Sequence, residues 1–264
     1  MSTTQLKIIA LIAMLIDHIG LFIPGTPEWF RWVGRIAIPI FIFGIVVGYE
    51  NTLNRKKYLF RLYLASFVMA LIVIFLNLTF RDMYYTLTNN FFAPLFLIAL
   101  IISIIKERQI KYIFIFLLWQ IITFSLIIFL SSNLSIPQVY DSDGAYYFWG
   151  SILGNILFVE GGPLFIILGV SLYFAHKKKI NVFILYTFFS IICFYVSQRW
   201  GSAYGIPEVR FSFPFGNNQW MMIAAVPLIL LYNNEKGKGL KYLFYIFYPT
   251  HIVILFLLGI YLQQ

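Results

Sequence analysis

Apolar runs of about 17–22 residues recur from one end of the chain to the other, and a helix needs roughly 20 apolar residues to cross a bilayer. The runs are apolar on all sides, which distinguishes membrane spans from the amphipathic helices of a soluble core. We therefore predict an all-α, polytopic membrane protein with about nine transmembrane helices, at 5–23, 33–50, 58–77, 90–105, 111–131, 153–175, 181–198, 218–232 and 241–261.

The connections between these runs are short, apart from two predicted loops at 132–154 and 199–217. No fixed-period repeat and no appended soluble stretch is visible, so residues 1–264 are predicted to form a single transmembrane domain. The first run is expected to be retained as a helix, because Asp17-His18 interrupts it and no small-x-small cleavage site follows.

Composition agrees with this prediction. Hydrophobic residues make up 61% of the chain and charged residues 11%, which excludes an ordinary cytosolic globule and a disordered chain. The basic residues are too few and too dispersed for a nucleic-acid-binding surface, so no nucleic-acid partner is expected. The single cysteine, Cys193, lies in an apolar run, so no intramolecular disulfide is possible.

The net charge of +9 is distributed unevenly between alternate connections. The connections between the predicted spans form two alternating sets, one with many basic residues and one with few. Basic residues concentrate in the cytoplasmic loops of membrane proteins, so the set that is richer in basic residues marks the inner side. The poorer set holds only Arg31, Arg35, Arg81, Arg199 and Arg210. The richer set predicts a cytoplasmic N-terminus and an outer C-terminus, and it comprises Lys7, Arg55, Lys56, Lys57, Arg61, Lys106, Arg108, Lys111, Lys177, Lys178, Lys179, Lys236, Lys238 and Lys241.

Five ionisable residues interrupt the predicted spans: Asp17, His18, Arg35, Glu160 and His251. Such residues are costly in a bilayer and mark a candidate site. At about 1.5 Å per residue, His18 lies about 16 Å beyond Lys7, and His251 lies about 15 Å beyond Lys241. The two histidines are therefore predicted at one level near the membrane centre, in a polar cavity that opens outward.

The partners of these residues stay open at this point. Neighbouring residues on a helix do not face the same way, so Asp17 could orient His18, Arg35 or His251. Arg35 and Glu160 could instead form a purely structural ion pair. Tyr248 lies one turn before His251 on the same face. Two histidines and scattered carboxylates lack the spacing of metal ligands, so no metal site is expected.

Three blocks of the chain carry a specific pattern of residues. They comprise Lys7, Met14, Asp17-His18 and Gly20; Gly34-Arg35, Pro39, Gly48-Tyr49, Asn54, Tyr58 and Arg61; and Tyr232-Asn233, Lys236-Gly237, Lys241-Tyr242 and Tyr248-Pro249-Thr250-His251. In order and spacing these blocks resemble the TraX family, membrane proteins associated with N-terminal acetylation of conjugative pilin. The middle of the chain matches only loosely, at Asn89-Asn90-Phe91 and Glu160-Gly161-Gly162.

The family is similar in turn to membrane acyltransferases that carry a basic residue and a histidine eleven positions apart on one helix, as Lys7 and His18 are here. The resemblance implies an acetyltransferase of the bacterial cytoplasmic membrane. Acetyl-CoA would be the donor from the cytoplasm, and a peptide amine or a surface-glycan hydroxyl would be the acceptor outside.

The residues themselves suit this chemistry. Acetyl transfer needs a base, for which histidine is the usual choice, and a donor for the developing oxyanion. We assign His18, as base or acetylated nucleophile, and Asp17 to catalysis. The acceptor would be bound by Arg35, Asn90, Glu160, Tyr248 and His251, and the CoA phosphates by Lys7, Arg55, Lys56, Lys57 and Arg61. The alternative function is a proton-coupled transporter or flippase that uses Asp17, Glu160 and the histidines as a relay.

Overall fold

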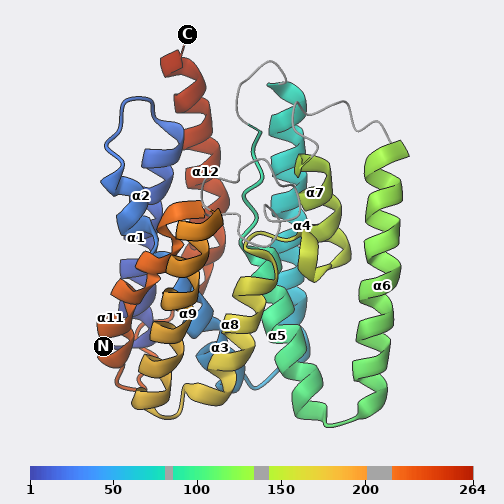
Figure 1. Ribbon diagram of the computed structural model, residues 1–264, viewed down its shortest axis with the longest axis vertical. Helices are drawn as coiled ribbons and strands as arrows, with labels where there is room; N and C mark the ends of the chain where they lie inside the picture. Colours follow the sequence, from blue (N-terminus) through green and yellow to red (C-terminus); the bar gives the residue numbers. More distant parts are fainter. Residues whose placement is uncertain (81–85, 134–142, 201–215, 264) are drawn as a thin grey trace. The chain divides into compact units, whose positions relative to one another are not determined.

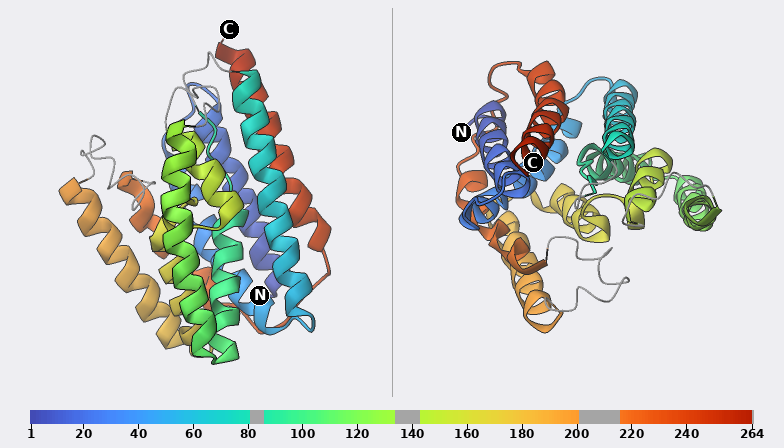
Figure 2. Two further views of the ribbon diagram at one scale, coloured as in Figure 1. Left: turned by 90° about the vertical axis from the view of Figure 1, so that its right-hand side faces the viewer. Right: turned by 90° about the horizontal axis from the view of Figure 1, so that it is seen from above.

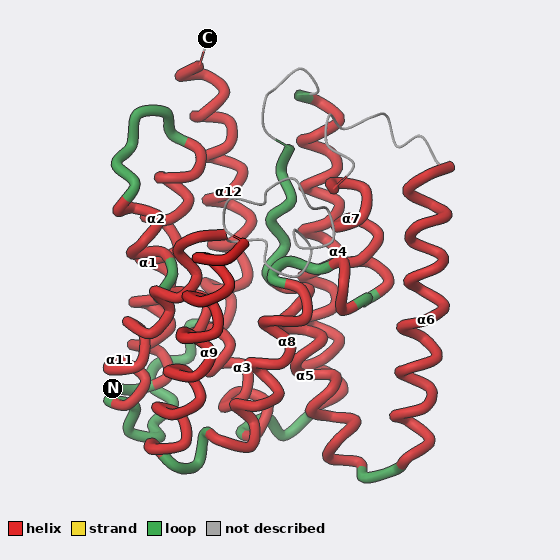
Figure 3. Tube along the Cα trace, in the orientation of Figure 1, coloured by secondary structure: helices red, strands yellow, loops and turns green. Residues whose placement is uncertain are grey.

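The computed structural model describes residues 1–80, 86–133, 143–200 and 216–263, and the regular structure of these residues is entirely helical (Figure 1, Figure 3). Residues 134–142 of the predicted loop at 132–154 and residues 201–215 of the predicted loop at 199–217 lie outside the described residues, as do Arg81 and Arg210. The all-α prediction is confirmed for the part of the chain that the structure describes.

Among the described residues, six helices are long and apolar enough to cross a membrane, which is the pattern of a multi-pass membrane protein. One of them is formed by α2 and α3 together, since only a short turn separates the two. Six of the nine predicted spans are thereby confirmed as helices of sufficient length and apolarity: α1 (Thr3–Phe22), α2 (Trp29–Gly34) with α3 (Ala37–Glu50), α4 (Arg55–Thr79), α6 (Ile110–Asn133), α9 (Lys179–Trp200) and α12 (Lys241–Gln263).

The other three predicted spans are shorter helices. The run at 90–105 becomes α5 (Phe92–Glu107), and the run at 218–232 becomes a 3-10 helix, η2 (Gly216–Ala225), followed by α11 (Val226–Leu230). The prediction of a continuous helix over 153–175 is wrong. There the chain forms the short 3-10 helix η1 (Ile156–Phe158) and enters α8 (Gly162–Ala175) only after Gly161, whose positive φ of 76° interrupts a right-handed helix.

A second correction concerns the predicted loop at 132–154, whose final part is the helix α7 (Asp143–Leu153). This helix has eleven residues of mixed polarity, so it does not stand out as an apolar run. Gly150 lies in close contact with the backbone of Phe158, so the helix packs tightly against the η1 turn that follows it.

The chain divides into two compact units, and each is described by itself. Unit 1 comprises Met1–Gly48, Ser171–Gly205 and Phe215–Gln264; unit 2 comprises Tyr49–Val170 and Ile206–Pro214. Helices α3 and α8 continue from one unit into the other. The prediction of one domain over 1–264 stays a prediction.

In unit 1, helix α1 packs against α2 and α12, and α9 packs against η2 (Figure 1, Figure 2). The N-terminal residues bond to the loop that precedes α12: the Thr3 amide donates to the Glu235 carbonyl at 2.8 Å, and the Thr4 hydroxyl donates to the Lys236 carbonyl at 2.9 Å. This places two of the predicted cytoplasmic segments together. The two chain ends lie at opposite ends of the unit (Figure 1).

In unit 2, α4 packs against α5 and α7, and α7 packs against α6. An irregular segment leads into α5 and is held by a buried side chain of α4, because Asn77 accepts from the Leu87 amide at 2.9 Å and donates to the Leu87 carbonyl at 2.8 Å. Leu87 is fully buried, so this irregular backbone is enclosed by protein, as non-helical backbone at membrane depth must be unless it lines a cavity.

Candidate functional site

Helix α1 presents two adjacent polar residues to two different neighbours. Successive side chains on a helix point about 100° apart, so Asp17 and His18 cannot face the same partner. Asp17 points toward α2, and His18 points toward α12. The site therefore has two parts, one on each side of α1.

On one side, His18 and His251 form a buried pair. The His18 Nδ1 and His251 Nε2 atoms are hydrogen-bonded at 2.6 Å, and the two rings stack with their centroids 4.9 Å apart. Each residue is only 6% exposed. The structure thus brings together two histidines that lie 233 positions apart, at the common level that the helical rise predicts.

Helix α12 fixes the orientation of His251. Its Nδ1 atom donates to the Phe247 carbonyl at 2.7 Å, and its ring stacks on the Phe247 ring at 4.8 Å. Buried Tyr248 places its ring edge-on to both histidines, at 6.4 Å from His18 and 5.7 Å from His251. These aromatic rings surround the histidine pair with apolar surface.

The close approach of α1 and α12 depends on a glycine. A Cβ at position 259 would collide with the Phe22 carbonyl, which lies one turn beyond His18 on α1. Gly259 therefore lets the two helix backbones come close enough for the histidine side chains to bond.

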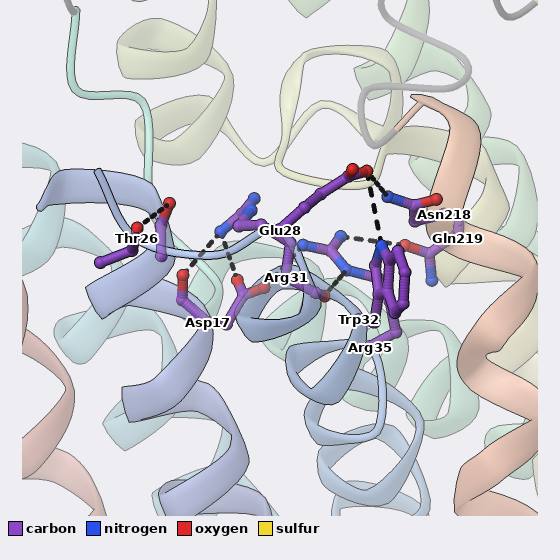
Figure 4. Close-up of polar contacts among 9 residues, drawn as sticks. Asp17, Thr26, Glu28, Arg31, Trp32, Arg35, Asn218 and Gln219 are labelled. Atoms are coloured by element: carbon purple, nitrogen blue, oxygen red, sulfur yellow. Dashed lines mark hydrogen bonds and ion pairs between the residues drawn. The ribbon is translucent and has the colours of Figure 1, made fainter. Parts of the chain in front are cut away.

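On the other side of α1, Asp17 bridges two arginines (Figure 4). Its Oδ2 atom accepts from Arg31 Nη1 at 2.8 Å, and its Oδ1 atom accepts from Arg35 Nη2 at 2.8 Å. Arg31 Nη1 also donates to the Asp17 carbonyl at 2.9 Å. Gly34 has no side chain, and a Cβ there would occupy the position of the Asp17 carboxylate. Of the partners that the sequence left open for Asp17, Arg35 is the one that it contacts.

Arg35 is more deeply buried than Arg31, with its side chain 3% exposed against 25%. Its Nε atom donates to the Arg31 carbonyl at 3.0 Å, and Nη1 donates to Gln219 at 3.4 Å. Gln219 is 1% exposed and belongs to η2. The predicted pairing of Arg35 with Glu160 stays a prediction, because the two residues belong to different units.

Arg31 and Gln219 are site residues that the sequence reasoning missed. Arg31 was counted only as an outer boundary charge. Its spacing of four from Arg35, within one helical turn, was the available signal that both could reach one carboxylate. Nothing in the sequence marks Gln219, whose place next to Arg35 arises from the packing of η2 in unit 1.

Unit 2 brings together two of the predicted acceptor-binding residues. The Asn90 amide donates to Glu160 Oε2 at 2.8 Å, and Asn90 Nδ2 donates to the Ser66 carbonyl at 2.9 Å. Asn90 is 3% exposed, and its Oδ1 atom accepts no hydrogen bond within the described part of the chain. This buried oxygen, beside a carboxylate, could accept a hydrogen bond from an incoming donor group.

The predicted CoA-binding residues fall in both units. Lys7 of unit 1 lies with its ammonium 5.4 Å from the centre of the Phe244 ring. In unit 2, Arg55 and Arg61 stack on neighbouring tyrosines, while Lys56 and Lys57 are exposed. The Arg61 Nε atom is buried and donates to no acceptor among the described residues, so it could serve a phosphate oxygen.

These features define a multi-pass helical membrane protein with a buried histidine pair beside an aspartate–arginine cluster. The sequence model of the TraX protein family matches residues 2–149, more than half of the chain, and the chain belongs to this family. The match includes α1, α2 and α3 with Asp17, His18 and Arg35, and it ends before His251.

The chain is also similar to the probable fimbrial assembly protein FimC, serogroup H1, of Dichelobacter nodosus. The two are 27% identical over 274 residues, which cover 99% of this chain and 97% of that protein. The similarity therefore extends through α12, beyond the family match. No solved structure matches the chain.

Proposed function

We propose that this protein is an integral membrane acetyltransferase that moves an acetyl group from cytoplasmic acetyl-CoA to an acceptor on the outer side of the bacterial cytoplasmic membrane. The observation that carries the proposal is the buried His18–His251 pair at mid-helix depth. A neutral imidazole in an apolar setting can take the proton of an amine or hydroxyl, which is what acyl transfer requires. Membership of TraX supports the same chemistry through the association of that family with pilin acetylation.

In this reaction, His18 Nε2 takes the proton of the acceptor as its nitrogen or oxygen attacks the thioester carbonyl. The bond from the carbonyl carbon to sulfur breaks, and the proton passes to the departing CoA thiolate. The products are the acetylated acceptor and free CoA. Tyr248, whose ring lies beside both histidines, is the candidate donor to the oxyanion.

The donor and acceptor would approach from opposite sides. Lys7, Arg55, Lys56, Lys57 and Arg61 would hold the CoA phosphates at the cytoplasmic side, with the thioester reaching inward. Arg35, Asn90 and Glu160 would contact the acceptor. Because the thioester would meet His18 at mid-helix depth, the whole donor would not need to cross the membrane.

The acceptor class follows from the relative rather than from the geometry. Fimbrial assembly, the role in the name of the Dichelobacter nodosus protein, supports the N-terminal amine of a surface-fibre subunit as acceptor. A surface-glycan hydroxyl is the alternative. Both acceptors need the same base and donor.

The test is purified protein incubated with labelled acetyl-CoA, first alone and then with a pilin-like peptide or an oligosaccharide. We expect label on the acceptor with the wild-type protein and with His176→Ala, whose histidine adjoins the run Lys177–Lys179. We expect a loss of at least about 100-fold with His18→Ala. Normal transfer by the His18 variant would overturn the assignment, and labelled protein that chases into acceptor would identify His18 as a nucleophile.

The same preparation addresses the alternative of a transporter. Proteoliposomes that show proton-coupled uptake, without any acetyl transfer or acetyl-CoA hydrolysis, would refute the acetyltransferase proposal and favour the relay function. We expect acetyl transfer without proton-coupled uptake.

A further inference from the structure

We propose that His251 is a positioning residue that fixes the tautomer of His18, so that Nε2 of His18 carries the free lone pair. The inference rests on the proposed function for its catalytic meaning. The tautomer itself follows from three groups that two hydrogen bonds join in series: the Phe247 carbonyl, the His251 ring and the His18 ring.

The direction of the hydrogen bonds begins at the backbone. A carbonyl oxygen only accepts, so His251 Nδ1, at 2.7 Å from the Phe247 carbonyl, must carry a proton. A neutral imidazole holds one proton, so His251 Nε2 is then an acceptor. The 2.6 Å bond to His18 therefore requires the proton to lie on His18 Nδ1, and His18 Nε2 is left unprotonated.

Nothing in the described part of the chain hydrogen-bonds to His18 Nε2. Both histidines are buried, and aromatic rings pack on each side of the pair. The ring is thus held in one orientation with a single basic nitrogen available, an arrangement in which the second group of a catalytic unit orients the base.

The hydrogen-bonded series of the Phe247 carbonyl, His251 and His18 also accommodates the positive charge that catalysis creates. When His18 Nε2 takes a proton from the acceptor, His18 becomes an imidazolium that donates from Nδ1 to His251 Nε2. If that Nδ1 proton moves to His251, the charge lies on His251, which still donates to the Phe247 carbonyl. The protons on His18 Nδ1 and His251 Nδ1 keep an acceptor whether the positive charge lies on His18 or on His251. The proton on His18 Nε2 is the one that later leaves to the CoA thiolate.

Two variants of His251 separate this role from packing. His251→Gln keeps an oxygen near the position of Nε2 that accepts from His18 Nδ1. His251→Phe keeps a flat ring that stacks on Phe247 but accepts nothing. We expect kcat to fall about 100-fold in His251→Phe and within about tenfold in His251→Gln, with the KM for acetyl-CoA unchanged in both. Equal losses in the two variants, or a change confined to KM, would overturn the role.

The tautomer is measured without any substrate, by ¹⁵N spectra of histidine-labelled protein in detergent at alkaline pH. The chain has three histidines, and His176 is an internal reference because its Nδ1 donates to the Tyr173 carbonyl at 2.8 Å. We expect His18 to show a protonated Nδ1 and a bare Nε2 in the wild type and in His251→Gln, and to lose this preference in His251→Phe.

A His18 protonated at Nε2 in the wild type, or a tautomer that does not respond to His251→Phe in a protein that elutes and unfolds like the wild type, would overturn the inference. This result is independent of activity. If the wild-type protein transferred no acetyl group, the proposed function would fail, and the spectra would still decide whether His251 sets the tautomer.

Discussion

The polar side chains on the two sides of helix α1 are stabilised in an apolar region by different interactions. On the arginine side, Asp17 holds two guanidinium groups by ion pairs of 2.8 Å each. On the histidine side, two neutral rings share one hydrogen bond and leave a nitrogen with no bonded partner in the described part of the chain. The first arrangement is held together by charge, and the second keeps a reactive group available.

Because their interactions differ, substitutions of the sequence neighbours Asp17 and His18 are expected to have different effects. Removing one member of a buried ion pair leaves an uncompensated charge and destabilises the fold strongly. Removing a neutral hydrogen-bonded ring costs less stability but removes the base. We therefore expect damage on the arginine side to appear in unfolding experiments, and damage on the histidine side to appear in turnover.

The largest effect on stability is expected from Asp17→Ala. It removes the carboxylate that both Arg31 and Arg35 contact, and the Arg35 side chain is only 3% exposed. The free energy of unfolding should fall by roughly 3–5 kcal/mol, measured by thermal or denaturant unfolding in detergent. The control is Glu28→Gln, an exposed acid next to the cluster, with an expected change within about 0.5 kcal/mol.

If Asp17→Ala abolished acetyl transfer while leaving the unfolding curve unchanged, the assignment of the arginine side to stability would be wrong. Asp17 would then act directly in the chemistry, as a tuning role beside His18 requires. A large loss of stability with turnover retained in the remaining folded fraction would sharpen the comparison.

Gly34→Ala perturbs the packing of the arginine side without removing any charge. The added Cβ would collide with the Asp17 side chain, so Asp17 or α2 must shift and both ion pairs must lengthen. Overpacking of this kind costs about 1–3 kcal/mol. Gly239→Ala is the matched control, because a Cβ there meets nothing within 4 Å. Equal melting temperatures for the two alanine variants would show that the cluster tolerates displacement.

Gly259→Ala is the corresponding change on the histidine side. The added Cβ would collide with the Phe22 carbonyl and push α12 away from α1, which stretches the 2.6 Å bond between the histidines. A stability loss of about 1 kcal/mol, the low end of the overpacking range, is expected. The larger effect should be on kcat, measured with labelled acetyl-CoA, and on the His18 tautomer. A variant with reduced stability and normal kcat would show that the spacing of the two helices does not matter for turnover.

Much of the fold was accessible from the sequence because long apolar runs report the length of a membrane span directly. The run that became α4 and the run that became α12 contain few polar residues and were placed to within a few positions. The interruption at Gly161 and the helix α7 were not predicted. The first depends on local turn geometry within an apolar run, and the second is too short and mixed to form one.

The sequence predicted the depth of the site residues along their helices but not the direction in which their side chains point. The fixed rise of a helix determines depth, so the distances from Lys7 to His18 and from Lys241 to His251 were enough to place the two histidines at one level. The direction in which a side chain points around its helix depends on which helices pack together. That is why the contact of Asp17 with Arg35 was one of several open possibilities, and why the parts played by Arg31 and Gln219 were missed.

Two lysine substitutions distinguish the two arginines. Arg35→Lys keeps the charge but loses the Nε bond to the Arg31 carbonyl and the fork that reaches both Asp17 and Gln219. Unfolding should lose about 1–2 kcal/mol. Arg31→Lys, at a side chain 25% exposed, keeps one donor for Asp17 and should lose less than about 1 kcal/mol. A greater loss at Arg31 than at Arg35, measured in the same detergent, would mean that exposure does not govern this side of α1 and that Arg31 supplies the main contact of Asp17.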